Sequence, residues 1–230
     1  MSISSITYFT VILTESLKTE KIFEIFIKNK KENRFRKKAL KRLKVSKIAF
    51  IPMELIPESS IFVNYIMRNT DEIRSYTYCE AGDILLAKIT PCFENGKQGI
   101  VPLEVPHGIA LATTEVFPIS PYTEKIDRLF LYYILKCDKY RKILEYKMTG
   151  TTGRRRVPRT ALENLMIPLP SLVEQKKIVS MLISIDRWIE LEKKHKEKLD
   201  RLKKGLMNLL LTGRIRVKVI KQGAFIGSSR

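Results

Sequence analysis

The sequence predicts an α+β protein, in which a globular domain with a small curved β-sheet and packed helices precedes one long coiled-coil helix. Three observations predict this class. Short apolar segments separated by turn residues fill 48–121, which favours an antiparallel or mixed sheet over parallel β-α-β units. Apolar residues recur at helical spacing after Asp127, and a heptad pattern runs through 171–213.

The strands are expected where apolar or β-branched runs end at glycine, proline or asparagine. Gly82-Asp83 indicates a turn before a strand, and Asn95-Gly96 is the dipeptide in this chain most typical of a β-hairpin. The last apolar run is expected to be a single strand, closed by Pro118 and Pro121. The expected strands are Ile48–Ile51, Ile84–Ile89, Gln98–Val101 and Ile109–Ile119.

Beyond Asp127 the apolar spacing predicts one or two packed helices, over Leu129–Cys137 and Tyr140–Met148. The glycines and arginines of 149–158 favour an exposed loop. A helical turn at 160–165 should follow it. Residues 166–170 should be extended, because a residue that precedes proline avoids the helical region.

The long helix has a start signal and an end signal. Ser171 and Glu174 have the spacing of a capping box, and Gly213 is a plausible C-cap after about 40 helical residues, or ~60 Å. Acid-first pairs at i, i+4 should support it, from Glu190 to Lys194, Glu192 to Lys196, Glu197 to Arg201 and Asp200 to Lys204.

A heptad seam runs along this helix and is apolar except at Glu192 and His195, which would fix register or orientation at some cost in stability. So long a seam predicts a second helix beside it, although a helix folded back on its own domain is an alternative. The apolar seam positions are Ile178, Met181, Ile185, Trp188, Leu199, Leu202, Leu206 and Leu209.

The composition points to nucleic acid. Lys and Arg number 43 against 24 Asp and Glu, which gives a net charge of +19. Such a surplus attracts polyanions, and the lipidation signal that a basic membrane-surface protein would carry is not found. No run approaches the ~20 apolar residues of a membrane span, and no signal peptide is evident, so we expect a cytoplasmic protein.

Four parts are expected: a basic N-terminal segment over 1–47, the globular domain over 48–170, the long helix over 171–213 and a tail over 214–230. The stretch 28–47 holds eleven Lys and Arg and one acid, Glu32. It is expected to be a solvated helix or tether, or an arm that tracks phosphates.

The sequence is poor in catalytic patterns. It has no phosphate-binding loop, no G-x-G-x-x-G, and no Asn/Asp-Pro-Pro-aromatic run of an amino-methyltransferase. Asp138 with Glu145 and Lys147 has the residue types of a metal nuclease, but in a helical stretch. We therefore expect no catalytic residue, metal or cofactor, with His107 and His195 outside any zinc site and the cysteines serving as core residues (Cys79, Cys92 and Cys137).

Three polar or basic loops carry the side chains that reach DNA bases and phosphates. Arginine forks suit guanine, amides suit adenine, a carboxylate accepts from cytosine and threonine methyls contact thymine. Each residue also has a structural alternative, such as a turn former, an ion-pair partner or a solvated surface residue. The candidate DNA-binding residues are Lys88, Thr90, Asn95, Lys97, Thr113, Thr114, Glu115, Thr151, Thr152, Arg154, Arg155 and Arg156.

Several motifs over roughly 45–218 resemble the specificity (S) subunits of type I restriction–modification systems. The segment 82–97 and Ala112–Phe117 resemble a target recognition domain, as do Leu129–Tyr133 and Gly150–Pro158. The junction 167–178, which reads Ile-Pro-Leu-Pro-Ser-Leu-Val-Glu-Gln-Lys-Lys-Ile, is the most specific motif. The end of the family's spacer helix and its tail resemble 201–207 and 210–217.

The resemblance implies DNA recognition without catalysis, by a subunit that directs modification (methyltransferase) and restriction subunits to a bipartite target. With one recognition domain over 48–170 and one spacer helix over 171–213, the chain is similar to half an S subunit. It would pair through the seam with a second copy or with another S fragment. The alternatives are a non-specific basic nucleic-acid-binding protein, a metal nuclease, or an inactive fragment of an S subunit.

Overall fold

The computed structural model describes residues 19–22, 45–151 and 153–217. The expectations for the basic stretch 28–47 lie outside the described residues except at its last three positions. The chain divides into two compact units, Met1–Val179 and Ser180–Arg230. Within the described ranges, no helix is both long enough and apolar enough to cross a membrane.

The first unit contains two main sheets instead of the single sheet that the sequence predicts. A mixed sheet has the order β3-β2-β7-β4, with β2 and β7 parallel and the other pairs antiparallel. An antiparallel sheet has the order β6-β5-β8. The strands are β2 (Lys47–Ile51), β3 (Ile66–Asn69), β4 (Thr77–Glu80), β5 (Ile84–Ala87), β6 (Gln98–Ile100), β7 (Ile109–Ala112) and β8 (Val116–Ile119).

The expectation of one strand over 109–119 is wrong, because the turn Thr113–Glu115 divides it into β7 and β8, which lie in different sheets. The Thr113 N–H still donates to the carbonyl of Ile51 beside the first sheet (3.0 Å). The Glu115 carbonyl already accepts from the Lys88 N–H beside the second sheet (3.0 Å). This polar turn therefore carries the chain from one sheet to the other.

The predicted hairpin between 84 and 101 is present, but its connection is longer than the two-residue turn that Asn95-Gly96 suggests. Strands β5 and β6 pair antiparallel, with Leu86 opposite Gln98. The whole segment 88–97 connects them, and Asn95-Gly96 is only its last turn, where Gly96 has a φ of 82°. The dipeptide marks the turn correctly and leaves the loop length undetermined.

A third pairing was not expected from the sequence. Strand β1 (Thr19–Lys21) pairs antiparallel with β9 (Met166–Pro168), which lies in the segment predicted to be extended. Ile22, just after β1, is fully buried, and its N–H donates to the Leu165 carbonyl (3.0 Å). A short piece of the N-terminal region is therefore built into the first unit.

The core occupies both faces of the mixed sheet. Alternate residues of a strand point to opposite faces. Ala49 and Ile51 belong to the larger apolar cluster, whereas Ile48 and Phe50 belong to a second, smaller cluster with Leu111. Both clusters are buried, so β2, β7 and β4 are covered on both sides, whereas every residue of the edge strand β3 is exposed.

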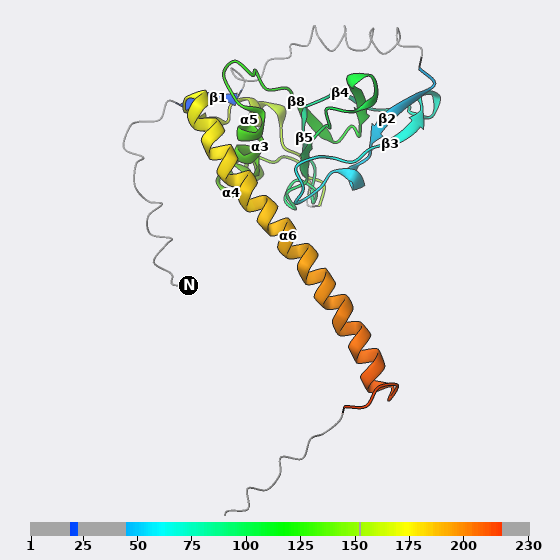
Figure 1. The fold of residues 1–230 in the computed structure, drawn as a ribbon. Coiled ribbons are helices and arrows are strands. Elements are labelled where there is room, and N and C mark those ends of the chain that lie inside the picture. Colours follow the sequence, from blue (N-terminus) through cyan, green and yellow to red (C-terminus); the bar gives the residue numbers. More distant parts are fainter. Residues whose placement is uncertain (1–18, 23–44, 152, 218–230) are drawn as a thin grey trace, which may run out of the picture. The chain divides into compact units, whose positions relative to one another are not determined.

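The two predicted helices after Asp127 are present as α3 (Arg128–Lys136) and α4 (Asp138–Tyr146), and the predicted helical turn is α5 (Arg159–Glu163). The Asp127 carboxylate caps α3 by accepting from the Leu129 N–H (2.9 Å) and the Phe130 N–H (3.1 Å). In Figure 1 these helices lie near β1, to one side of the strands of the two main sheets. Short 3-10 turns complete the unit at Met53–Leu55, Thr70–Glu72 and Pro106–Gly108.

The long helix α6 (Leu172–Leu211) has 40 residues, which confirms its predicted length and, with the sheets, the α+β class. The Ser171 hydroxyl accepts from the Glu174 N–H (3.3 Å), as the capping box predicts, and Gly213 has a φ of 73° beyond the helix end. Two of the expected i, i+4 ion pairs are present, Glu190–Lys194 (2.7 Å) and Glu197–Arg201 (3.8 Å).

Candidate nucleic-acid interface

The three loops singled out in the sequence meet at the end of strand β5. Lys88, the residue after this strand, is where they join. Its N–H donates to the carbonyl of Glu115 (3.0 Å), and its carbonyl accepts from the N–H of Val157 (2.8 Å). The segments 88–97, 113–115 and 149–157 therefore form one loop cluster held together by backbone hydrogen bonds.

The arginine-containing loop is held in an extended conformation within this cluster. The Arg155 carbonyl accepts from the Thr90 N–H (3.0 Å), while Arg156 exchanges backbone hydrogen bonds with Thr149 (2.9 and 2.7 Å). Gly150 makes the return of the chain possible. Its φ is +123°, and a Cβ there would lie 2.6 Å from the Arg154 carbonyl oxygen, so a side chain would disturb the arginine segment.

Two ion pairs connect the arginines to the other loops. Arg155 Nη2 lies 3.2 Å from Oε1 of Glu94, which also accepts from the Thr90 hydroxyl (2.7 Å). Arg156 Nη2 lies 2.9 Å from Oε1 of Glu115. Glu115 is therefore an ion-pair partner, which is one of the structural alternatives named for the candidate residues, and Glu94 belongs to the loop cluster although the sequence reasoning did not select it.

Lys88 contributes a partly buried positive charge to the cluster. Its Nζ lies 5.2 Å from the centre of the Phe117 ring. Burial lowers the pKa of Lys88 below the usual range of a lysine, the Glu115 carboxylate opposes this by raising the pKa, and Arg156 lowers it further. The side chain is thus a cation whose charge the fold makes costly, which is typical of functional sites.

Two cationic side chains, Lys136 of α3 and Arg141 of α4, donate hydrogen bonds to backbone carbonyls of the loop 88–97. The Arg141 guanidinium is buried, donates to the carbonyl of Phe93 and to Oε1 of the buried Gln98 (2.8 Å), and lies 4.5 Å from the Phe93 ring centre. Lys136 Nζ donates to the Gly96 carbonyl (3.2 Å). These supports were missed, although an arginine on the apolar side of α4, beside Tyr140 and Leu144, is a signal that could have been used.

The remaining candidates differ in accessibility. Asn95, Thr114, Thr151 and Arg154 are exposed on the loop cluster, while Thr152 lies outside the described residues. The Thr113 hydroxyl accepts from the Glu115 N–H (3.4 Å) and so helps to form the turn. The ammonium of Lys97 donates to the Met53 carbonyl (3.0 Å), which directs it into the domain.

The residues of the nuclease alternative do not come together. Asp138 begins α4 and Glu145 lies two turns later on it, which separates them by roughly 10 Å along the axis. Over the described ranges, no group of three or more His, Cys, Asp or Glu is placed to hold a metal ion. The expectation for the cysteines is correct for the buried Cys79 and wrong for Cys137, which is exposed.

Gln175, in the first turn of α6, is another residue that the sequence reasoning passed over. Its side chain is fully buried and bonds three backbone groups, accepting from the Asp127 N–H (2.7 Å) and donating to the carbonyls of Pro170 (2.8 Å) and Lys125 (3.2 Å). The start of α6, up to Val179, is thereby attached to the cap of α3 within the first unit.

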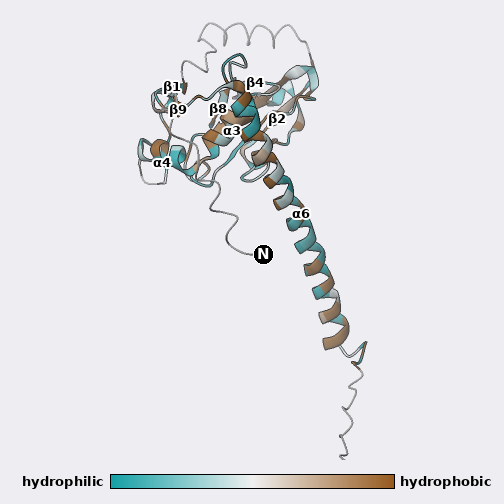
Figure 2. Ribbon diagram, turned by 60° about the vertical axis from the view of Figure 1, so that its left-hand side comes forward, coloured by the Kyte–Doolittle hydropathy of each residue, from teal (hydrophilic) through white to brown (hydrophobic). Residues whose placement is uncertain are grey.

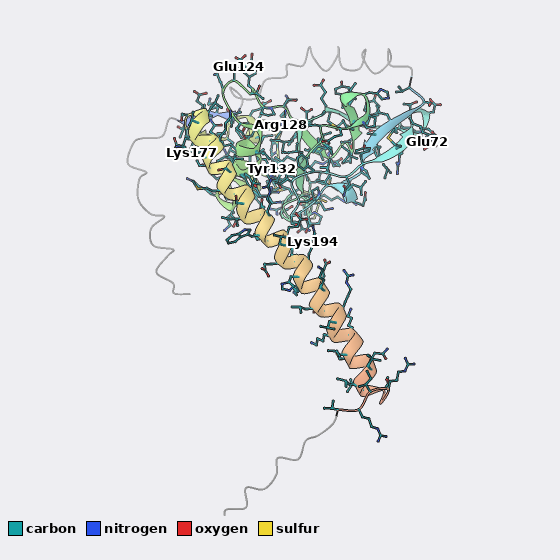
Figure 3. The ribbon with its side chains drawn as sticks, in the orientation of Figure 1. Glu72, Glu124, Arg128, Tyr132, Lys177 and Lys194 are labelled. Carbon is teal, nitrogen blue, oxygen red and sulfur yellow. The ribbon has the colours of Figure 1, made fainter. Side chains whose placement is uncertain are left out.

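The seam residues of the second unit are exposed except Leu209, which is partly buried. The exposed fraction is 54% for Ile185, 75% for Trp188 and 59% for Leu202. Figure 2 shows hydrophobic residues recurring along α6, and Figure 3 shows side chains projecting from the helix beyond the labelled Lys194. A row of exposed apolar side chains, interrupted here by Glu192 and His195, is typical of an interaction surface.

Comparisons with known proteins agree with this geometry. Residues 14–201 match the family model of the type I restriction modification DNA specificity domain. The chain is 41% identical over 136 residues to the type I restriction enzyme EcoAI specificity subunit of Escherichia coli, covering 57% of this chain and 23% of that protein. It is 40% identical over 139 residues to the MjaVIII specificity subunit of Methanocaldococcus jannaschii, covering 60% and 32%.

Solved structures share the fold. The HsdS subunit from Thermoanaerobacter tengcongensis matches with a TM-score of 0.62 and 16% identity, over 87% of this chain and 50% of that chain. A chain from a type I R-M system, solved to study complex assembly and conformational transition, matches with a TM-score of 0.69 and 15% identity, over 93% and 53%. The chain thus spans about half of these structures and between 23% and 32% of the two curated relatives. With most of its length matched by the family model, the chain belongs to the type I restriction modification DNA specificity domain family.

Proposed function

We propose that the chain is a sequence-specific DNA-binding specificity subunit that contains no catalytic site of its own. The observation that carries this proposal is the loop cluster at the end of β5, where three segments distant in the sequence present forked and amide donors on one support. Rigidly supported loops are the usual carriers of recognition residues. The similarity to curated specificity subunits supports the same role.

Within this proposal, the loop cluster reads one short half-site. Arg154, Arg155 and Arg156 offer the forked donors that guanine accepts in the major groove. Exposed Asn95 suits adenine, and Thr114 suits a thymine methyl. Lys88, beside the arginines, suits a phosphate oxygen and would position the domain without reading a base.

The partners follow from the family and from α6. We propose that modification and restriction subunits use this chain to reach a bipartite target in the cytoplasm, with 48–170 as the recognition domain and 171–213 as the spacer. Pairing of two copies, or with another S fragment, would bury the exposed seam. A symmetric pair would read an interrupted palindrome, and the ~60 Å helix would limit the half-site separation to roughly 18 base pairs.

The test is selection of duplexes from a random DNA library by the full chain, alone and with the modification subunit, at about 0.05 and 0.2 M salt. Recovery of one motif that persists at the higher salt is expected, because base contacts discriminate after phosphate binding has weakened. Uniform loss of binding without a motif would instead support a non-specific basic protein. Methylome sequencing of the source organism with and without the gene would then test the motif in the cell.

A matched pair of variants sharpens this test. Arg156→Lys keeps the charge and loses the planar fork, so the preference for the selected motif should fall by about 10-fold or more while the salt dependence is unchanged. Arg74→Lys makes the same change at an exposed position outside the loop cluster and should leave the motif intact. Equal behaviour of the two variants would exclude Arg156 from base reading.

A further inference from the structure

We propose that Glu94 and Glu115 are positioning residues, which hold Arg155 and Arg156 for base reading and keep them from binding phosphates indiscriminately. This inference rests on the proposed function and assigns a positioning role within the same loop cluster. It also reassigns Glu115, which the sequence suggested as a direct acceptor from cytosine. The evidence is two ion pairs at the extended segment 155–157, one between Arg155 and Glu94 and the other between Arg156 and Glu115.

The backbone explains why consecutive arginines meet different carboxylates. Residues 155–157 lie extended against 88–90, with the Arg155 carbonyl and the Val157 N–H bonded to that segment. Successive side chains of an extended segment point to opposite sides. Arg155 therefore reaches Glu94 on the loop 88–97, whereas Arg156 reaches Glu115 on the turn between β7 and β8.

The two carboxylates are less exposed than the arginines that they bind. The side chains of Arg155 and Arg156 are 40% and 61% exposed, whereas those of Glu94 and Glu115 are 19% and 24% exposed. In both glutamates Oε2 is buried without a hydrogen-bond partner among the described residues. A carboxylate with so little exposure is poorly placed to meet a base edge, but it is well placed to orient the guanidinium that it binds.

Each ion pair also leaves the arginine with free donors. The contact in both pairs runs through a single nitrogen, Nη2, to a single oxygen, Oε1. A guanidinium has five N–H groups, and guanine needs two of them for its O6 and N7. One end of the fork can therefore be held by the protein while donors remain for a base.

The electrostatic consequence separates this role from a purely structural one. A paired carboxylate offsets the arginine charge, which weakens attraction to any phosphate, while its directional hydrogen bond favours one orientation of the fork. Removing the carboxylate should thus strengthen non-specific binding and weaken specific binding. A salt bridge that serves only the fold would weaken both when it is broken.

The experiment compares Glu94→Gln and Glu115→Gln with Glu104→Gln, which removes the same charge from an exposed turn outside the loop cluster. Dissociation constants are measured by fluorescence anisotropy for the selected duplex and for a scrambled duplex at about 0.15 M salt. We expect the scrambled duplex to bind about threefold tighter and the selected duplex about tenfold weaker in the two test variants. Thermal unfolding of each variant reports on the fold.

A second background tests whether Glu115 acts through Arg156. In Arg156→Met, adding Glu115→Gln should change the affinity for the selected duplex by less than about twofold, since the group it orients is gone. An undiminished tenfold effect in that background would overturn the inference and favour direct base contact by Glu115.

The outcomes also separate this inference from the proposed function. If wild type selects a motif and the two glutamate variants behave as Glu104→Gln does, the positioning role is wrong and the proposed function stands. Parallel weakening for both duplexes would likewise overturn it. If wild type selects no motif, alone or with the modification subunit, the proposed function fails and the positioning role fails with it.

Discussion

The two units of the molecule differ in whether their prominent side chains have partners within the chain. In the first unit, charged groups at the loop cluster find partners within the chain, as Arg155 does with Glu94 and Arg156 with Glu115. In the second unit, apolar side chains such as Trp188 and Leu199 are exposed along the helix. The comparison teaches that the chain itself builds the geometry of the loop cluster, whereas the proposed pairing with another helix would be what buries the seam.

Interrupting the seam should have the largest effect of any change to this protein. Leu199→Lys with Leu206→Lys would place charges in the seam of both partners of a self-pair, at a cost of roughly 4 kcal/mol or more in association. Sedimentation should show a monomer, as should a chain cut back after Trp188. Asn208→Lys introduces a lysine at an exposed position roughly 200° around the helix from Leu206, and this variant should still pair. A double variant that sediments as wild type does would break the comparison.

Removing the buried Arg141 guanidinium, which donates to the loop 88–97, should have the next largest effect. Arg141→Met leaves the Phe93 carbonyl, the Leu135 carbonyl and Oε1 of Gln98 without their donor in a buried site. We expect urea unfolding to show a loss of about 3 kcal/mol in the free energy of unfolding of the first unit. Lys142→Met, at the exposed next position on α4, is the control. Equal stability of the two variants would mean that the buried network contributes little.

The difference between the units also explains what the sequence could predict. Elements that depend on local signals were predicted well, since Asp127, Ser171 and Gly213 mark helix ends within a few residues of the groups they bond. Strand pairings between segments far apart in the sequence were not predicted. Strand β1 meets β9 across most of the domain, and only the folded chain brings its residues to Met166–Pro168.

The loop cluster shows the same limit. The three loops of the cluster could be singled out from the sequence, but Arg155 and Glu94 are 61 positions apart and Arg156 and Glu115 are 41 apart. No periodicity connects such residues. The division of 109–119 into two strands was missed for a similar reason, because the bonds from Thr113 to Ile51 and from Lys88 to Glu115 belong to different sheets.

A change at Gly150 should have an intermediate effect confined to the loop cluster. Gly150→Ala combines a φ of +123° with a Cβ 2.6 Å from the Arg154 carbonyl oxygen, and should cost about 2 kcal/mol. DNA selection should show a weakened motif, because the arginine segment must move. Gly153→Ala, with a φ of +79° and no atom within 4 Å of the new Cβ, should cost about 1 kcal/mol and keep the motif. A retained motif in Gly150→Ala would show that this segment tolerates displacement.

The smallest expected effect is at Lys88, where stability and binding should change in opposite directions. Burial lowers the pKa of Lys88 from its usual 10.5, so the charged form is less favourable in the folded protein than in the unfolded chain. Lys88→Met should therefore raise the free energy of unfolding by about 0.5 kcal/mol near neutral pH, a small gain because the site is only half-buried, while DNA affinity falls.

The pH dependence identifies the cause of that gain. Between the lowered folded-state pKa and 10.5, the unfolded chain binds more protons at Lys88 than the folded protein does, so the contribution of Lys88 to wild-type stability rises with pH. The advantage of Lys88→Met should thus shrink as the pH approaches 10.5 in thermal unfolding. An advantage that stays constant over this window would point to packing against Phe117 rather than to the buried charge. In that case the loop cluster would bear no electrostatic cost at Lys88 for its proposed phosphate contact.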